Sequence, residues 1–106
     1  MRRGAAWCDE TYRRRIGAAF TAKVAEWKPD FVFVIAGFRL AGDVIRAVRK
    51  KHGIPIANFV VDDPAFCSRT LLHDLAAYSS IFCIDRSWMP VIGQFNPQIY
   101  YLPHAG

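Results

Sequence analysis

Residues 31–35 read Phe-Val-Phe-Val-Ile, a run in which every side chain is aromatic or β-branched. Such side chains favour strands, and here both alternating sets are apolar, which is typical of a strand covered on both faces. Pro29 precedes the run and ends the helical pattern before it, because proline cannot extend a helix and restricts the residue preceding it. The run therefore predicts a central strand of a parallel sheet.

Helical patterns lie on both sides of this run. Apolar residues recur at helical spacing over residues 9–27, which predicts one amphipathic helix. After the run, a second helix is expected from about Leu40 to His52, where several basic residues complement the negative end of the helix dipole. Gly53 follows, and glycine adopts the left-handed conformation of a helix end at little cost.

The rest of the chain continues this alternation of strands and helices. Ser68 is expected to cap a third helix and Ser87 a short fourth one, because a serine hydroxyl can accept a hydrogen bond from an N–H group of the first turn. Three further strands are expected at residues 56–61, 81–84 and 99–102. Alternation with short connections favours parallel pairing through right-handed crossovers.

These patterns predict one α/β domain over residues 1–106. We expect a Rossmann-like, three-layer (αβα) arrangement with a parallel sheet of about four strands and helices on both of its faces. The length of 106 residues and the 53% hydrophobic content suit a single domain with a substantial core. No strand precedes the helix at residues 9–27, so either a preceding segment is missing or residues 1–7 fray. Apolar side chains on this helix, Tyr12, Phe20 and Trp27, predict a homodimer or another partner.

The cysteines and the hydropathy pattern indicate a cytoplasmic protein. The three cysteines, Cys8, Cys67 and Cys83, are scattered and form no C-x-x-C pair, which disfavours a disulfide framework and a zinc site. The longest apolar stretch is too short to cross a bilayer, and no signal-peptide pattern opens the chain.

The net charge of +5 is concentrated in the first half of the chain. A basic half can bind nucleic acid or an anionic membrane, and this is one of three functional hypotheses. We rank it last, because the basic residues lie on predicted outer helices without interleaved exposed aromatics and the predicted strand exits are acidic.

Candidate ligand-binding residues lie at the carboxyl ends of the predicted strands, where open α/β sheets bind their ligands. They are Gly37, Phe38, Asp62, Asp63, Asp85, Arg86 and His104. No G-x-G-x-x-G, Walker A, G-x-S-x-G or H-E-x-x-H motif occurs, so the sequence predicts no nucleotide cofactor on this chain and no metal, and catalytic residues stay unknown.

Each candidate also has a structural interpretation. Adjacent residues leaving a strand point to opposite sides, so one carboxylate of Asp62-Asp63 can instead cap the turn at Pro64. Asp85 can pair with Arg86 rather than with a ligand. A lone histidine such as His104 is a weak indication of acid–base chemistry.

An ordered series of short segments resembles one protein family. They are Lys28-Pro29-Asp30 before a strand, Gly53-Ile54-Pro55 before the next, Asp62-Asp63-Pro64 after it, Asp74 to Tyr78, Ile81 to Asp85, and Tyr101-Leu102-Pro103-His104-Ala105. Over residues 28–106 the chain is similar to the N-terminal domain of CgeB-like spore-maturation proteins, a group of GT-B glycosyltransferases.

The resemblance implies the acceptor-side half of a two-domain glycosyltransferase. In such enzymes the nucleotide-sugar donor is held mainly by a second Rossmann-like domain, which would be the partner here, and a sugar or glycan acceptor meets the N-terminal one. The alternative from another functional class is a non-catalytic Rossmann-like module that binds a ligand or a protein. A second α/β domain encoded on the same or a neighbouring gene would distinguish the two.

Overall fold

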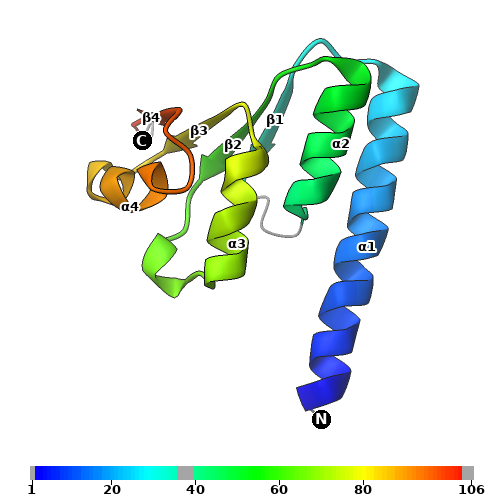
Figure 1. Ribbon diagram of the computed structural model, residues 1–106, viewed down its shortest axis with the longest axis horizontal. Helices are drawn as coiled ribbons and strands as arrows, with labels where there is room; N and C mark the ends of the chain where they lie inside the picture. Colours follow the sequence, from blue (N-terminus) through cyan, green and yellow to red (C-terminus); the bar gives the residue numbers. More distant parts are fainter. Residues whose placement is uncertain (1, 36–39, 104–106) are drawn as a thin grey trace.

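The computed structural model describes residues 2–35 and 40–103 (Figure 1). Its helices are α1 (Arg2–Trp27), α2 (Gly42–His52), α3 (Arg69–Asp74) and α4 (Met89–Gly93), and its strands are β1 (Val32–Ile35), β2 (Ile56–Val60), β3 (Ser80–Cys83) and β4 (Ile99–Tyr101). Three short 3₁₀ turns complete the order: η1 (Pro64–Phe66), η2 (Leu75–Ala77) and η3 (Arg86–Trp88). The predicted alternation of strands and helices is confirmed.

All four strands are parallel and stand in the order β1-β2-β3-β4. The α/β class and the four-stranded parallel sheet are therefore confirmed, and each strand lies within one residue of its predicted bounds at either end. The register pairs Val32 with Ile56 and Asn58 with Ile81, which places these side chains on the same face of the sheet.

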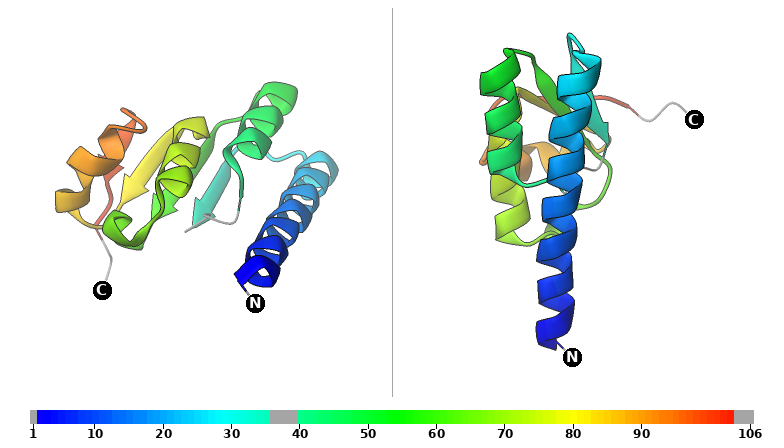
Figure 2. Two further views of the ribbon diagram at one scale, coloured as in Figure 1. Left: turned by 60° about the horizontal axis from the view of Figure 1, so that its bottom comes forward. Right: turned by 90° about the vertical axis from the view of Figure 1, so that its right-hand side faces the viewer.

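Helices α2, α3 and α4 lie along one face of this sheet, and α1 runs beside its edge strand β1 (Figure 2). The sequential strand order explains this placement, because right-handed crossovers that all advance in one direction put their helices on one side. Helices on the other face, which the apolar pattern of residues 31–35 predicts, are not found in residues 2–35 and 40–103. The described part of this Rossmann-like arrangement thus comprises the sheet and one helical layer.

The core lies between the sheet and this helical layer. Ile45 and Val48 of α2 and Leu75 of η2 are almost fully buried, and they share one apolar cluster with Ile56 and Ile81 of the sheet. Burying an aliphatic side chain of this size stabilises a fold by about 1.5–3 kcal/mol. The cluster therefore holds the two layers together.

Local chemistry fixes two helix boundaries as predicted. Gly53 ends α2 with a φ of 64°, and its N–H donates to the carbonyl of Arg49. Ser68 caps α3, because its hydroxyl oxygen accepts a hydrogen bond from the N–H of Leu71 at 3.2 Å.

Across the two described ranges, no helix has the combination of length and hydropathy that crossing a membrane demands.

Candidate functional site

A hollow of about 500 Å³ opens at the carboxyl end of β2. We call it the rim hollow, and it is lined by Val61, Asp62, Asp63, Phe66, Cys67, Leu71 and Trp88. Its walls come from the exit of β2, from η1, from the first turn of α3 and from η3. This is the end of a parallel sheet where strand exits present side chains to ligands.

The two carboxylates of the rim hollow differ in what they bind. An oxygen of Asp63 accepts a hydrogen bond from the N–H of Ala65 at 2.9 Å, and so caps η1 across Pro64. Asp62 is exposed and makes no hydrogen bond or ion pair with the described residues. The structural interpretation of the pair therefore applies to Asp63, whereas Asp62 is available to a ligand.

Aromatic side chains give the rim hollow an apolar wall. The Phe66 side chain is 90% exposed, although it is large and apolar. Trp88, which is half-buried and packs against the core, lines the same hollow from a different segment of the chain. A flat aromatic ring beside a carboxylate provides both an apolar surface and a hydrogen-bond acceptor.

The pKa of the Cys67 thiol depends on burial and on both carboxylates of the rim hollow. Burial raises the pKa of Cys67, and the negative charges of Asp62 and Asp63 raise it further. The thiol is therefore held in its protonated form, which is a poor nucleophile. Cys67 is a wall of the hollow rather than a reactive group.

Asp85 and Arg86 follow the next strand and are engaged elsewhere. Asp85 accepts hydrogen bonds from the N–H of Ser87 at 2.9 Å and from its hydroxyl at 2.7 Å, and these bonds lower the pKa of Asp85. The prediction that Ser87 caps the fourth helix is wrong, because Asp85 caps η3 and Ser87 donates to it. The guanidinium of Arg86 lies over the ring of Tyr101, 4.6 Å from its centroid.

The seven predicted residues are thus only partly brought together. Asp62 and Asp63 line the rim hollow, and Asp85 and Arg86 do not. Gly37, Phe38 and His104 lie outside the described residues. Sequence reasoning missed Phe66 and Trp88 as site residues, and the position of Phe66 two residues after the strand exit Asp62-Asp63-Pro64 was the signal that could have identified it.

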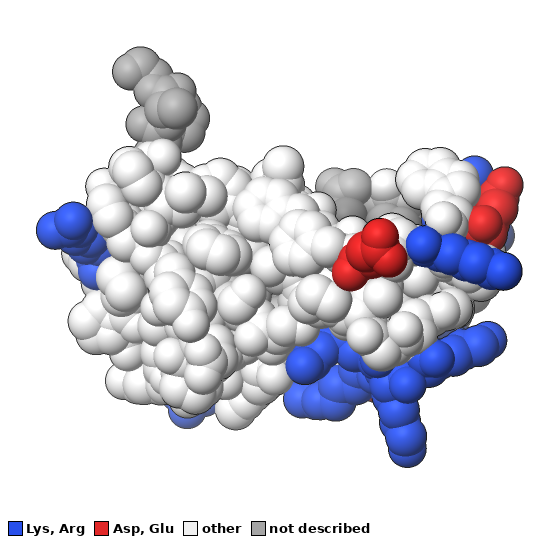
Figure 3. Space-filling view, turned by 90° about the horizontal axis from the view of Figure 1, so that it is seen from above, with Lys and Arg blue, Asp and Glu red and all other residues white. Residues whose placement is uncertain are grey.

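A second hollow, of about 510 Å³, lies at the opposite end of the strands and is basic. Arg46, Arg49 and Lys50 of α2 line it together with Ser79. Figure 3, which views this end from above, shows Lys and Arg side chains gathered on the helical side. Arg49 donates to the carbonyl oxygen of Ala77 at 2.7 Å, so part of this charge joins α2 to η2.

Within residues 2–35 and 40–103, no three His, Cys, Asp or Glu side chains are grouped so that they could hold a metal ion. Comparison of the chain with protein-family models, curated proteins and solved structures identified no match. The chemistry of the rim hollow is therefore the basis for a functional proposal.

Proposed function

We propose that this chain is the acceptor-side domain of a GT-B glycosyltransferase of the CgeB-like kind, and that the rim hollow receives a sugar of the acceptor. The observation that carries the proposal is the pairing of an available carboxylate, Asp62, with the exposed ring of Phe66 around one hollow. The resemblance of residues 28–106 to that family supports it independently.

The two kinds of wall match the two kinds of surface on a sugar ring. A pyranose has a face of C–H groups that packs on an aromatic ring, and the hydroxyl groups at its edge donate hydrogen bonds. Phe66 offers the ring and Asp62 the acceptor, since a carboxylate can accept from two neighbouring hydroxyl groups. A sugar bound in this way would present another hydroxyl to the cleft for transfer.

The charge of the rim hollow favours an acceptor over a nucleotide-sugar donor. Asp62 and Asp63 are both in its lining, and none of its lining residues is basic. A diphosphate would meet repulsion from two carboxylates at short range. Donor binding therefore belongs to a second domain, and transfer requires both domains.

The proposal can be tested by following backbone amide signals of the chain by NMR while sugars or nucleotides are added. We expect a panel of methyl glycosides to shift the signals of Asp62, Phe66 and Cys67, with affinities near the millimolar range because half of a cleft covers little ligand surface. Uridine and thymidine diphosphates are expected to leave these signals unchanged.

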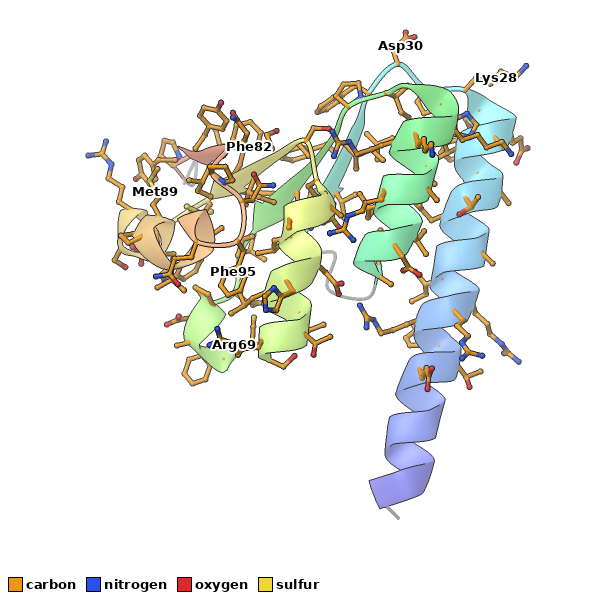
Figure 4. All side chains as sticks on the ribbon, in the orientation of Figure 1. Lys28, Asp30, Arg69, Phe82, Met89 and Phe95 are labelled. Atoms are coloured by element: carbon orange, nitrogen blue, oxygen red, sulfur yellow. The ribbon has the colours of Figure 1, made fainter. Side chains whose placement is uncertain are left out.

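Matched variants locate the binding. Asp62→Asn and Phe66→Ala should each weaken the sugar response at least several-fold. Asp30→Asn is the control, because Asp30 is an exposed carboxylate in the loop before β1, at the other end of the strands (Figure 4). A saturable response of the rim hollow to a nucleoside diphosphate, or no response there to any glycoside, would refute the proposal.

A further inference from the structure

The face of the sheet turned away from the helices is apolar and aromatic. The side chains on it form two cross-strand rows, Phe33-Ala57-Ser80 and Ile35-Phe59-Phe82-Tyr100. We call this surface, together with Phe31, the open face. Its rings form a continuous series, with centroids 6.3 Å apart for Phe31 and Phe33, 6.0 Å for Phe33 and Phe82, and 5.6 Å for Phe82 and Tyr100.

The open face is large enough to form an interface. Ile35 is 63% exposed, Phe31 52%, Tyr100 48% and Phe33 40%. With roughly 150–250 Å² per aromatic side chain, these residues alone leave roughly 400 Å² of each copy in water. Two such faces supply most of the ~1,000 Å² that a specific interface needs, and the half-buried Phe59 and Phe82 add to it.

The distribution of charge allows two copies to meet at the open face. No residue of the two rows is charged. The basic residues Arg46, Arg49 and Lys50 of α2 lie on the helical side (Figure 3), whereas Lys23 of α1 lines a hollow with Phe31 and Phe33 at the edge of the open face. Because each copy carries a net charge of +5, pairing through the open faces keeps the two basic layers on the outside and far apart.

We propose that the open face is the interface of a homodimer in which the sheets of two copies pack face to face. Such a contact is isologous, with the same patch on both sides, and the uncharged aromatic surface is complementary to itself. Two sheets pack about 10 Å apart with interdigitating side chains, which the flat rings of Phe33, Phe82 and Tyr100 allow. No residue of the open face lines the rim hollow, so the dimer interface does not include the hollow of either copy.

The mass of the chain in solution tests this proposal directly. Sedimentation equilibrium over a range of concentrations should show the wild-type chain converting from one copy to two. Ile35→Lys and Tyr100→Lys place a charge at opposite ends of the second row, and each should weaken dimerisation at least tenfold. Because both positions are exposed in the single copy, circular dichroism should show the wild-type fold for each variant.

Two controls separate this interface from other contacts. Phe66→Lys changes a more exposed aromatic residue away from the open face and should leave the dimer intact while removing the sugar response. Val91→Lys on α4, where Val91 is 41% exposed in the helical layer, is the second control and should also leave the dimer intact. A dimer formed through strand edges or through α1 would survive Tyr100→Lys, and that result, or a wild-type chain that stays a single copy at all concentrations, would overturn the proposal.

Discussion

The carboxylate of Asp74 on α3 accepts a hydrogen bond from the backbone N–H of Gly42, the first residue of α2, at 3.0 Å. The residue before α2 provides no side-chain cap, so Asp74 caps this helix from another element. Its second oxygen accepts from the guanidinium of Arg13 at 2.8 Å. A side chain at position 42 would place its Cβ 3.0 Å from this carboxylate, which explains the glycine.

The first prediction concerns this junction of three helices. Asp74→Ala should lower the free energy of unfolding by roughly 1.5–3 kcal/mol, because it removes a helix cap and leaves the partly buried Arg13 without its partner. Urea unfolding measures the change. Glu10→Gln is the control, since the exposed Glu10–Arg14 pair should contribute less than about 1 kcal/mol. Equal effects of the two substitutions would contradict the capping role of Asp74.

The junction also shows which parts of the fold the sequence predicts. The strands and the boundaries at Gly53 and Ser68 depend on neighbouring residues, and these predictions are confirmed. The contact between Asp74 and Gly42 joins residues 32 positions apart, and no local pattern indicates it. Caps within a segment are therefore predictable, whereas caps supplied by another element are not.

Two other differences between the predicted and the observed structure have physical causes. The second helical layer is not found in the described residues, and Asp85 rather than Ser87 provides a cap. The alternating apolar sets of residues 31–35 indicate that both faces avoid water, but hydropathy does not say whether the same chain covers the second face. Asp85 and Ser87 are both good capping residues, and only the geometry of η3 decides between them. The rim hollow was predictable at Asp62 and Asp63, but Trp88 reaches it from a distant segment.

The second prediction follows from the cap at Asp85. Hydrogen bonds from Ser87 lower the pKa of Asp85 below its ordinary 3.8, so the ionised carboxylate stabilises η3. This contribution is present above the ordinary pKa and is lost as the pH falls through the lower value of the folded protein. In an acid titration by NMR, the amide signal of Ser87 should shift with a midpoint below 3.8. Asp85→Asn should abolish the shift, and a midpoint at or above the ordinary value would contradict the cap.

The third prediction concerns Tyr78, which is only 3% exposed. Burial raises the pKa of Tyr78 from 10.0 to about 12, and the neighbouring Asn58 partly offsets this rise. The unfolded chain ionises first, so the stability that the neutral phenol provides is complete below pH 10 and is lost as the pH rises toward 12. Urea midpoints of the wild-type chain should therefore fall more steeply over this window than those of Tyr78→Phe. Parallel pH profiles for the two proteins would show that the phenol ionises without penalty.

The fourth prediction uses Cys67 to report on the charge in the rim hollow. Burial is the main cause of its raised pKa, and Asp62 is the second. Asp62→Asn removes this negative charge, so the pKa should fall, the thiolate fraction at mildly alkaline pH should rise, and iodoacetamide should modify Cys67 faster. Mass spectrometry of the peptide that contains Cys67 measures the rate and separates it from the other cysteines.

The size and specificity of this effect distinguish a shared hollow from a general change in the protein. Because burial stays in place, the rate should rise only a few-fold and not to that of a free thiol. Asp30→Asn removes the same charge at the other end of the strands and should leave the rate unchanged, since solvent screens charges separated by more than about 8–10 Å. An equal acceleration by both variants would show that Cys67 responds to net charge alone. No acceleration by Asp62→Asn would show that the Asp62 carboxylate does not face the hollow, and the sugar-binding role proposed for it would fail with the same measurement.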